Sequence, residues 1–170
     1  MTRTRLKHLI RLAALIALQV VLSRFLAINI GTVLKFSFGF VAVVMAAHLY
    51  GVPGACAVAA VSDVIGAVLF PMGEFFIGYT LTATLTGLIY GLFLYKKQDW
   101  PRTIAAVCIN QFVLSLFLNT LWISILYGSP YVPLLATRIV QCLILTAVQL
   151  VCIQAIAKAI SRYGKSFSAA

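Results

Sequence analysis

Residues 9–25, LIRLAALIALQVVLSRF, form the first of six long apolar runs in this chain. A bilayer core of about 30 Å is crossed by roughly 20 apolar helical residues, so such a run is typical of a transmembrane helix. Within it, residues 13–22 lack the period-two alternation that a membrane β-barrel requires. The other runs lie near residues 36–50, 53–70, 76–95, 103–127 and 133–160. We therefore predict an all-α integral membrane protein with six transmembrane helices.

The composition supports the same class of protein. Of 170 residues, 63% are hydrophobic and 9% are charged, against about 25% charged residues in an ordinary soluble domain. A soluble domain of about 150 residues still exposes roughly 30% of the surface of its unfolded chain, so it could not hide this much apolar surface. We expect a single membrane domain over residues 1–170, in contact with the lipid bilayer.

The charges indicate how the chain is oriented. Thirteen Lys and Arg residues stand against three acids, and the net charge is +10. In a soluble protein this excess would suggest nucleic acid, but here the bases lie between apolar runs, and we expect no nucleic-acid partner. Four bases lie in the N-terminal tail, three at residues 96–102 and three in the C-terminal tail. With six spans these segments share one side, which predicts cytoplasmic termini in a multi-pass plasma-membrane protein.

Three bases break that pattern, because the same topology places Arg24, Lys35 and Arg138 toward the outer face. Ionisable groups at membrane depth are costly and usually serve a cavity, a partner or a pathway. Arg24 and Lys35 could instead extend to the outer headgroups, and internal pairing with Asp63 or Glu74 is a second alternative. Three bases against two acids still leave an excess of positive charge. We predict a site for an anionic solute, in which Arg supplies a bidentate fork for a carboxylate.

Other polar and aromatic residues fall in the same layer. An aromatic belt at the membrane interface would explain some of them without any ligand. A carboxylate or an amide within the membrane, however, must find a hydrogen-bond partner. Together they suit a ligand with a planar ring and an acidic tail. The candidate substrate-binding residues added by this argument are Asp63, Glu74, Phe75, Phe76, Tyr79, Asn119, Trp122 and Tyr127.

The sequence contains no set of residues typical of an enzyme. His8 and His48 have no metal-pair spacing, and no Walker motif or nucleophile–base set is present. The four Cys residues all lie in apolar runs and are best explained as small buried hydrophobes. We therefore predict no catalytic residues, no metal and no cofactor, and we expect any energy for transport to come from partner proteins.

Small residues form two possible helix-contact strips. In the first run Ala13 and Ala17 are four residues apart, with Ala14 beside them, so they share a helix face. This face could pack internally or could dock a partner. The fourth run carries a similar strip at Ala83, Gly87 and Gly91, for which internal packing is the favoured interpretation.

Over nearly its whole length the chain resembles a known family. It looks like a substrate-binding S component of an energy-coupling factor (ECF) vitamin transporter, and most like the folate-specific type. The order and spacing of several stretches together carry this resemblance. They are residues 21–25 VLSRF, 62–71 SDVIGAVLFP, 76–81 FIGYTL, 87–93 GLIYGLF, 118–122 LNTLW, and Arg138.

The resemblance implies a prokaryotic plasma-membrane protein with six helices and cytoplasmic termini. Its vitamin site would open outward beneath the loops near residues 27–34, 71–75 and 128–132. Its partners would be a transmembrane coupling subunit, facing the strip at Ala13 and Ala17, and two cytoplasmic ATPase subunits.

For the substrate, the resemblance implies folate. Arg24, Lys35 and Arg138 would meet its carboxylates, and the aromatic residues would stack on its pterin ring. Asp63 would either accept hydrogen bonds from the pterin or brace the helices. Another vitamin, such as pantothenate, remains an alternative. A non-transport membrane scaffold is a second alternative from a different class, and a membrane enzyme is the third.

Overall fold

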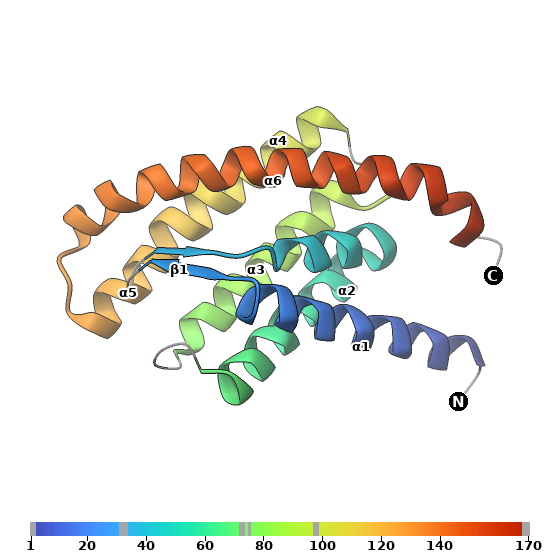
Figure 1. The fold of residues 1–170 in the computed structure, drawn as a ribbon, viewed down its shortest axis with the longest axis horizontal. Helices are drawn as coiled ribbons and strands as arrows, with labels where there is room; N and C mark the ends of the chain where they lie inside the picture. The colour runs from blue at the N-terminus through green and yellow to red at the C-terminus, as the bar shows by residue number, and fades with distance from the viewer. Residues whose placement is uncertain (1–2, 31–33, 72–73, 75, 97–98, 168–170) are drawn as a thin grey trace.

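The structure is a computed structural model that describes residues 3–30, 34–71, 74, 76–96 and 99–167. Within these residues, five helical segments are long and apolar enough to cross a membrane. The fourth segment is continuous but changes from α to π geometry and back (Figure 1). The elements are α1 (Arg3–Arg24), β1 (Ile28–Ile30), β2 (Leu34–Phe36), α2 (Phe40–Leu69), α3 (Ile77–Leu94), α4 (Trp100–Cys108), η1 (Ile109–Leu118), α5 (Asn119–Tyr127) and α6 (Tyr131–Phe167).

The second and third predicted runs form one element, α2, which is broken at Gly51. This glycine has φ 68° and ψ −154°, a backbone conformation outside the helical region. Pro53 follows within the same element, and a proline lacks the N–H that an uninterrupted helix would use. Figure 1 shows that the ribbon of α2 doubles back on itself. Ala46 and Val58, from the two halves, share one buried cluster with Leu15 of α1.

The segment between α1 and α2 differs from the prediction. The strands β1 and β2 pair in an antiparallel hairpin, in which Asn29 pairs with Lys35. Lys35 therefore lies in β2 and does not open a helix, and α2 begins only at Phe40. The alternation of polar and apolar residues here is too short to have predicted a strand from the sequence.

The strip of small residues on α3 packs internally. An added Cβ at Gly87 would lie 2.7 Å from the carbonyl oxygen of Ala55, and one at Gly91 would lie 2.5 Å from Cα of Val52. Ala83, on the same strip, packs against the buried core shared by α2 and α3. These glycines allow the two helix backbones to approach closely.

Gly87→Ala should therefore destabilise the fold. The new Cβ would press on backbone atoms of α2, and overpacking of this kind costs about 1–3 kcal/mol. We expect a lower midpoint of thermal unfolding for the purified protein in detergent. Leu92→Ala is the matched control, since Leu92 lies on the exposed face of α3. Equal midpoints for Gly87→Ala and the wild type would contradict this account of the α2–α3 contact.

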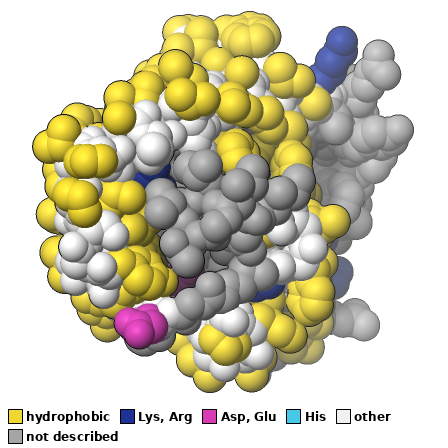
Figure 2. Space-filling model, turned by 60° about the vertical axis from the view of Figure 1, so that its left-hand side comes forward, with side chains coloured by type: hydrophobic (Ala, Val, Ile, Leu, Met, Phe, Trp, Pro, Cys, Tyr) yellow, Lys and Arg dark blue, Asp and Glu magenta, His cyan; other side chains and the backbone are white. Residues whose placement is uncertain are grey.

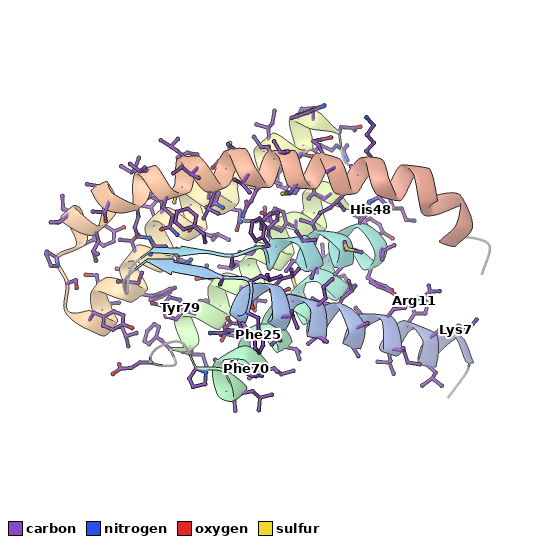
Figure 3. All side chains as sticks on the ribbon, viewed as in Figure 1. Lys7, Arg11, Phe25, His48, Phe70 and Tyr79 are labelled. Carbon is purple, nitrogen blue, oxygen red and sulfur yellow. The ribbon has the colours of Figure 1, made fainter. Side chains whose placement is uncertain are left out.

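The two ends of the molecule differ. The start of α1 and the end of α6 lie at the same end, opposite the hairpin (Figure 1). Lys7, Arg11 and His48 lie toward the end that holds the termini (Figure 3). Tyr79 lies toward the hairpin end, as do Phe25 and Phe70, whose ring centroids are 5.0 Å apart. The arrangement separates a basic end from an end built of loops and aromatic residues.

Candidate functional site

A cavity of about 490 Å³ lies among the helices, lined by residues of α1, α2, α3, η1, α5 and α6. This volume falls within the usual range of about 300–1,000 Å³ for small-molecule sites. Most of the site residues predicted from the sequence lie on its wall. They are Arg24, Asp63, Glu74, Phe76, Tyr79, Asn119, Tyr127 and Arg138.

The other three predicted residues are Trp122, Phe75 and Lys35. Trp122 stands behind the wall: its Nε1 donates a hydrogen bond to Oγ1 of Thr82 at 3.0 Å, and Thr82 itself lines the cavity. Phe75 and the side chain of Lys35 lie outside the described part of the structure. Their predicted roles therefore stay predictions.

Arg138 is the most unusual residue of the wall. It lies on α6 and is only 5% exposed, whereas the side chains of its neighbours Ile139 and Val140 are exposed on the surface of the molecule. Its Nε and Nη1 atoms have no hydrogen-bond partner among the described residues. A buried charged group without partners is costly, so a bound anion would satisfy donors that the described protein atoms leave open. Figure 2 views the hairpin end, where many of the described side chains are hydrophobic and a few charged ones are visible.

Arg24 reaches the cavity from the last turn of α1. Its guanidinium lies against Gly66 of α2, where an added Cβ would be 2.6 Å from Nε. The Asp63 carboxylate, one turn earlier on α2, attracts this guanidinium. Oδ2 of Asp63 also accepts a hydrogen bond from Oγ1 of Thr80 at 2.8 Å. Asp63 therefore joins α2 to α3 while it lines the cavity beside a cation.

Aromatic side chains cluster where α3 begins. The Phe76 ring lies 6.2 Å from the Tyr79 ring in an edge-to-face arrangement, and 5.4 Å from the Trp122 ring. Gly78 leaves room for this cluster, because an added Cβ there would be 2.5 Å from the Phe76 ring and 2.7 Å from Trp122. Phe76 and Tyr79 line the cavity, so the cluster gives it a planar apolar surface suited to a ring.

Asn119 was predicted, but sequence reasoning missed the other neutral amides of the site. The Oε1 atoms of Gln19 and Gln111 and Oδ1 of Asn119 are buried without a hydrogen-bond partner in the described part of the chain. The sequence did contain a signal, since Gln19 interrupts the first apolar run, but a search based on charge does not detect it. The missed amides of the cavity wall are Gln19, Asn110, Gln111, Gln141 and Gln149.

The π-helical segment brings two of these amides, Asn110 and Gln111, to the cavity. π-helical turns are rare and occur frequently at functional sites. In η1 the buried face carries Asn110, Gln111 and Leu114, and the same wall continues to Asn119 in α5. The wider turns thus direct residues four or five apart toward one side.

The arrangement combines cations, a planar aromatic surface and neutral amides around one cavity. Among the described residues, no cluster of three His, Cys, Asp or Glu side chains could hold a metal ion. The fold and the cavity define a class: a helical membrane protein with a cavity whose wall is suited to holding an anionic, ring-containing solute.

Comparison with known sequences identifies the family. Residues 7–157 match the family described as ECF transporter, substrate-specific component, and the chain belongs to this family. It is 39% identical over 134 residues to the folate transporter FolT of Clostridium novyi (strain NT), covering 78% of this chain and 77% of that protein. It is 34% identical over 151 residues to the folate transporter FolT of Leuconostoc mesenteroides, covering 84% of this chain and 80% of that protein.

A solved structure shares the fold. The crystal structure of FolT bound with folic acid matches with a TM-score of 0.85 and 34% sequence identity. The match covers 90% of this chain and 93% of that chain. The predicted resemblance to a substrate-binding component of an ECF transporter is therefore confirmed.

Proposed function

We propose that this chain is the folate-binding component of an ECF-type importer. The observation that carries the proposal is the buried Arg138 guanidinium, whose Nε and Nη1 have no hydrogen-bond partner among the described residues and which lines the cavity. An anion of the right size would pair with it by charge-assisted hydrogen bonds. The similarity to folate transporters and to a structure bound with folic acid supports folate as that anion.

The proposed contacts follow the chemistry of the wall. Arg138 and Arg24 would bind carboxylate groups, with Lys35 as a third cation from the hairpin. Phe76 and Tyr79, together with Phe75 and Tyr127, would enclose the planar part of the ligand, with Trp122 supporting them from behind.

The remaining polar residues of the predicted site have smaller proposed roles. Asn119 would hydrogen-bond the ligand through its amide. Asp63 would hold Arg24 in place, and Glu74 would stand where the cavity meets the loop before α3.

The proposed topology has six spans, because the two halves of α2 separated at Gly51 would count as two. Both termini would face the cytoplasm of a bacterial cell, since the basic side chains Lys7 and Arg11 lie at the end that holds the start of α1 and the end of α6 (Figures 1 and 3). The hairpin end and its aromatic cluster would then face outward, where the solute enters.

The proposed partners are a transmembrane coupling subunit and two cytoplasmic ATPase subunits. Membership in a transporter family supports a binding component that does no chemistry of its own. Ala13, Ala14 and Ala17 are all exposed on α1. Small exposed side chains allow another helix to approach closely, so this face would receive the coupling subunit.

Ligand titration of the purified protein tests this function. Trp122 lies 5.4 Å from Phe76 at the cavity wall, so its fluorescence should change when a ring enters. We expect folic acid to quench the emission with saturation and pantothenate to leave it unchanged. Trp122→Phe should remove most of the signal, whereas Trp100→Phe, at the start of α4, should retain it. Saturable quenching by pantothenate and none by folic acid would assign the site to another vitamin.

A further inference from the structure

A buried hydrogen-bond network joins three helices at one end of the cavity. Its centre is the Tyr90 hydroxyl on α3, which is 0% exposed. Nδ2 of Asn110 in η1 donates a hydrogen bond to this hydroxyl at 3.0 Å. The hydroxyl in turn donates to Oε1 of Gln149 in α6, also at 3.0 Å. Asn110 and Gln149 line the cavity wall, and Tyr90 lies behind them.

The network determines which amide atoms remain for a ligand. Oδ1 of Asn110 accepts a hydrogen bond from Oγ1 of Thr86 at 2.8 Å, and Oε1 of Gln149 accepts from Tyr90. A side-chain amide has two N–H donors beside its oxygen. Each of these amide oxygens thus already accepts one hydrogen bond, while one N–H of Asn110 and the N–H groups of Gln149 remain to donate to the acceptor atoms of a ligand.

This end of the cavity differs from the cationic part of its wall. Gln149 lies eleven residues after Arg138 on the same helix, roughly 16 Å along its axis at about 1.5 Å per residue. A guanidinium suits a carboxylate, whereas neutral N–H groups suit the ring nitrogens and oxo group of a heterocycle. The two kinds of donor thus lie at different levels of the cavity wall. A ligand that spans them would place its benzoyl ring and carboxylate tail near Phe76, Tyr79 and Arg138, and its heterocycle at the amide end.

We propose that Tyr90 is a positioning residue for ligand specificity. It holds Asn110 and Gln149 so that their N–H groups meet the acceptor edge of the ligand's heterocyclic ring, a role that rests on the folate-binding function proposed above. Tyr90 acts through these two amides and does not touch the ligand. Without its hydroxyl, the Gln149 amide can rotate and offer either its oxygen or its nitrogen to the cavity.

The test compares ring and tail selectivity in Tyr90→Phe. Folic acid has a 4-oxo acceptor on its ring, and aminopterin has a 4-amino group in that place. Pteroic acid keeps the ring of folic acid but lacks the glutamate tail. We expect the preference of the protein for folic acid over aminopterin to fall about fivefold, of the order of one hydrogen bond. The ratio of affinities for folic acid and pteroic acid should stay unchanged.

Controls separate positioning from a general structural effect. Tyr95→Phe, an exposed tyrosine just after α3, should leave both ratios unchanged. Gln149→Leu should lower the ring preference by a similar factor, and the double variant with Tyr90→Phe should lower it no further. A ring preference that Tyr90→Phe leaves unchanged, or a tail ratio that changes equally, would overturn the inference. If wild-type protein bound none of the three ligands, the proposed function itself would fail.

Discussion

Arg138→Met should lower the affinity for folic acid about a hundredfold while the protein still folds. The guanidinium is buried on the cavity wall, and its Nε and Nη1 have no partner within the described residues. Truncating one partner of a buried hydrogen-bonded charge pair costs about 2–5 kcal/mol of binding free energy. Met retains much of the side-chain volume, so the cavity wall should keep its packing. Calorimetric titration of the purified variant measures the loss.

Two further variants make this result specific. Arg138→Lys should bind with intermediate affinity, because an ammonium keeps the charge but loses the bidentate fork. Arg102→Met removes an exposed base near the start of α4, and it should bind as the wild type does. An affinity for folic acid that is unchanged in Arg138→Met would contradict the assignment of this residue to the anion site.

Ala17→Trp should abolish ATP-driven folate uptake in cells without weakening folate binding by the isolated protein. Ala17 is exposed on α1, beside Ala13 one turn earlier. An indole there would prevent the close helix approach that small residues allow. Among the described residues of α1, those that line the cavity are Gln19, Ser23 and Arg24, so ligand binding should be preserved.

Val151→Trp is the matched control for this experiment. Val151 is 69% exposed on α6, so the indole there would enter the surroundings of the helix without touching the proposed docking face. Uptake should persist in this variant. Normal uptake by Ala17→Trp would show that the coupling subunit docks elsewhere, whereas loss of uptake in both variants would point to a general defect in insertion or expression.

Much of the helical framework can be predicted from the sequence, because apolar runs of sufficient length leave a chain few alternatives in a bilayer. The run at 76–95 corresponds closely to α3 (Ile77–Leu94). The sequence also predicted the break near residues 50–53, which the structure has at Gly51, because Gly and Pro disturb a helix locally. That the two halves would pack against each other depends on contacts between distant residues, and local sequence does not encode such contacts.

The hairpin and the π-helical segment could not have been predicted in the same way. Residues 28–30 and 34–36 form strands because they pair with each other, and a three-residue strand has almost no periodicity to detect. In η1, the hydrogen bonding shifts by one residue within an otherwise ordinary apolar run. Both features depend on the packing of the surrounding chain.

The candidate site was predictable where a residue is costly in a membrane. Arg24, Asp63 and Arg138 were identified because charges at membrane depth are costly and usually serve a function. All three line the cavity. Asn110 and Gln149 were missed, since a neutral amide costs less and can be satisfied by a neighbouring helix. The role of Tyr90 follows only from distances between helices. The parts predicted for Lys35 and Phe75 stay predictions.

One measurement tests the central claim most directly: isothermal titration of folic acid into the purified protein, alone in detergent, without any partner subunit. The account predicts saturable binding of one folic acid per chain, because one cavity among the helices of this chain brings together the residues of the proposed site. If titration with folic acid gives no heat of binding, in protein that unfolds cooperatively on heating, the account is contradicted.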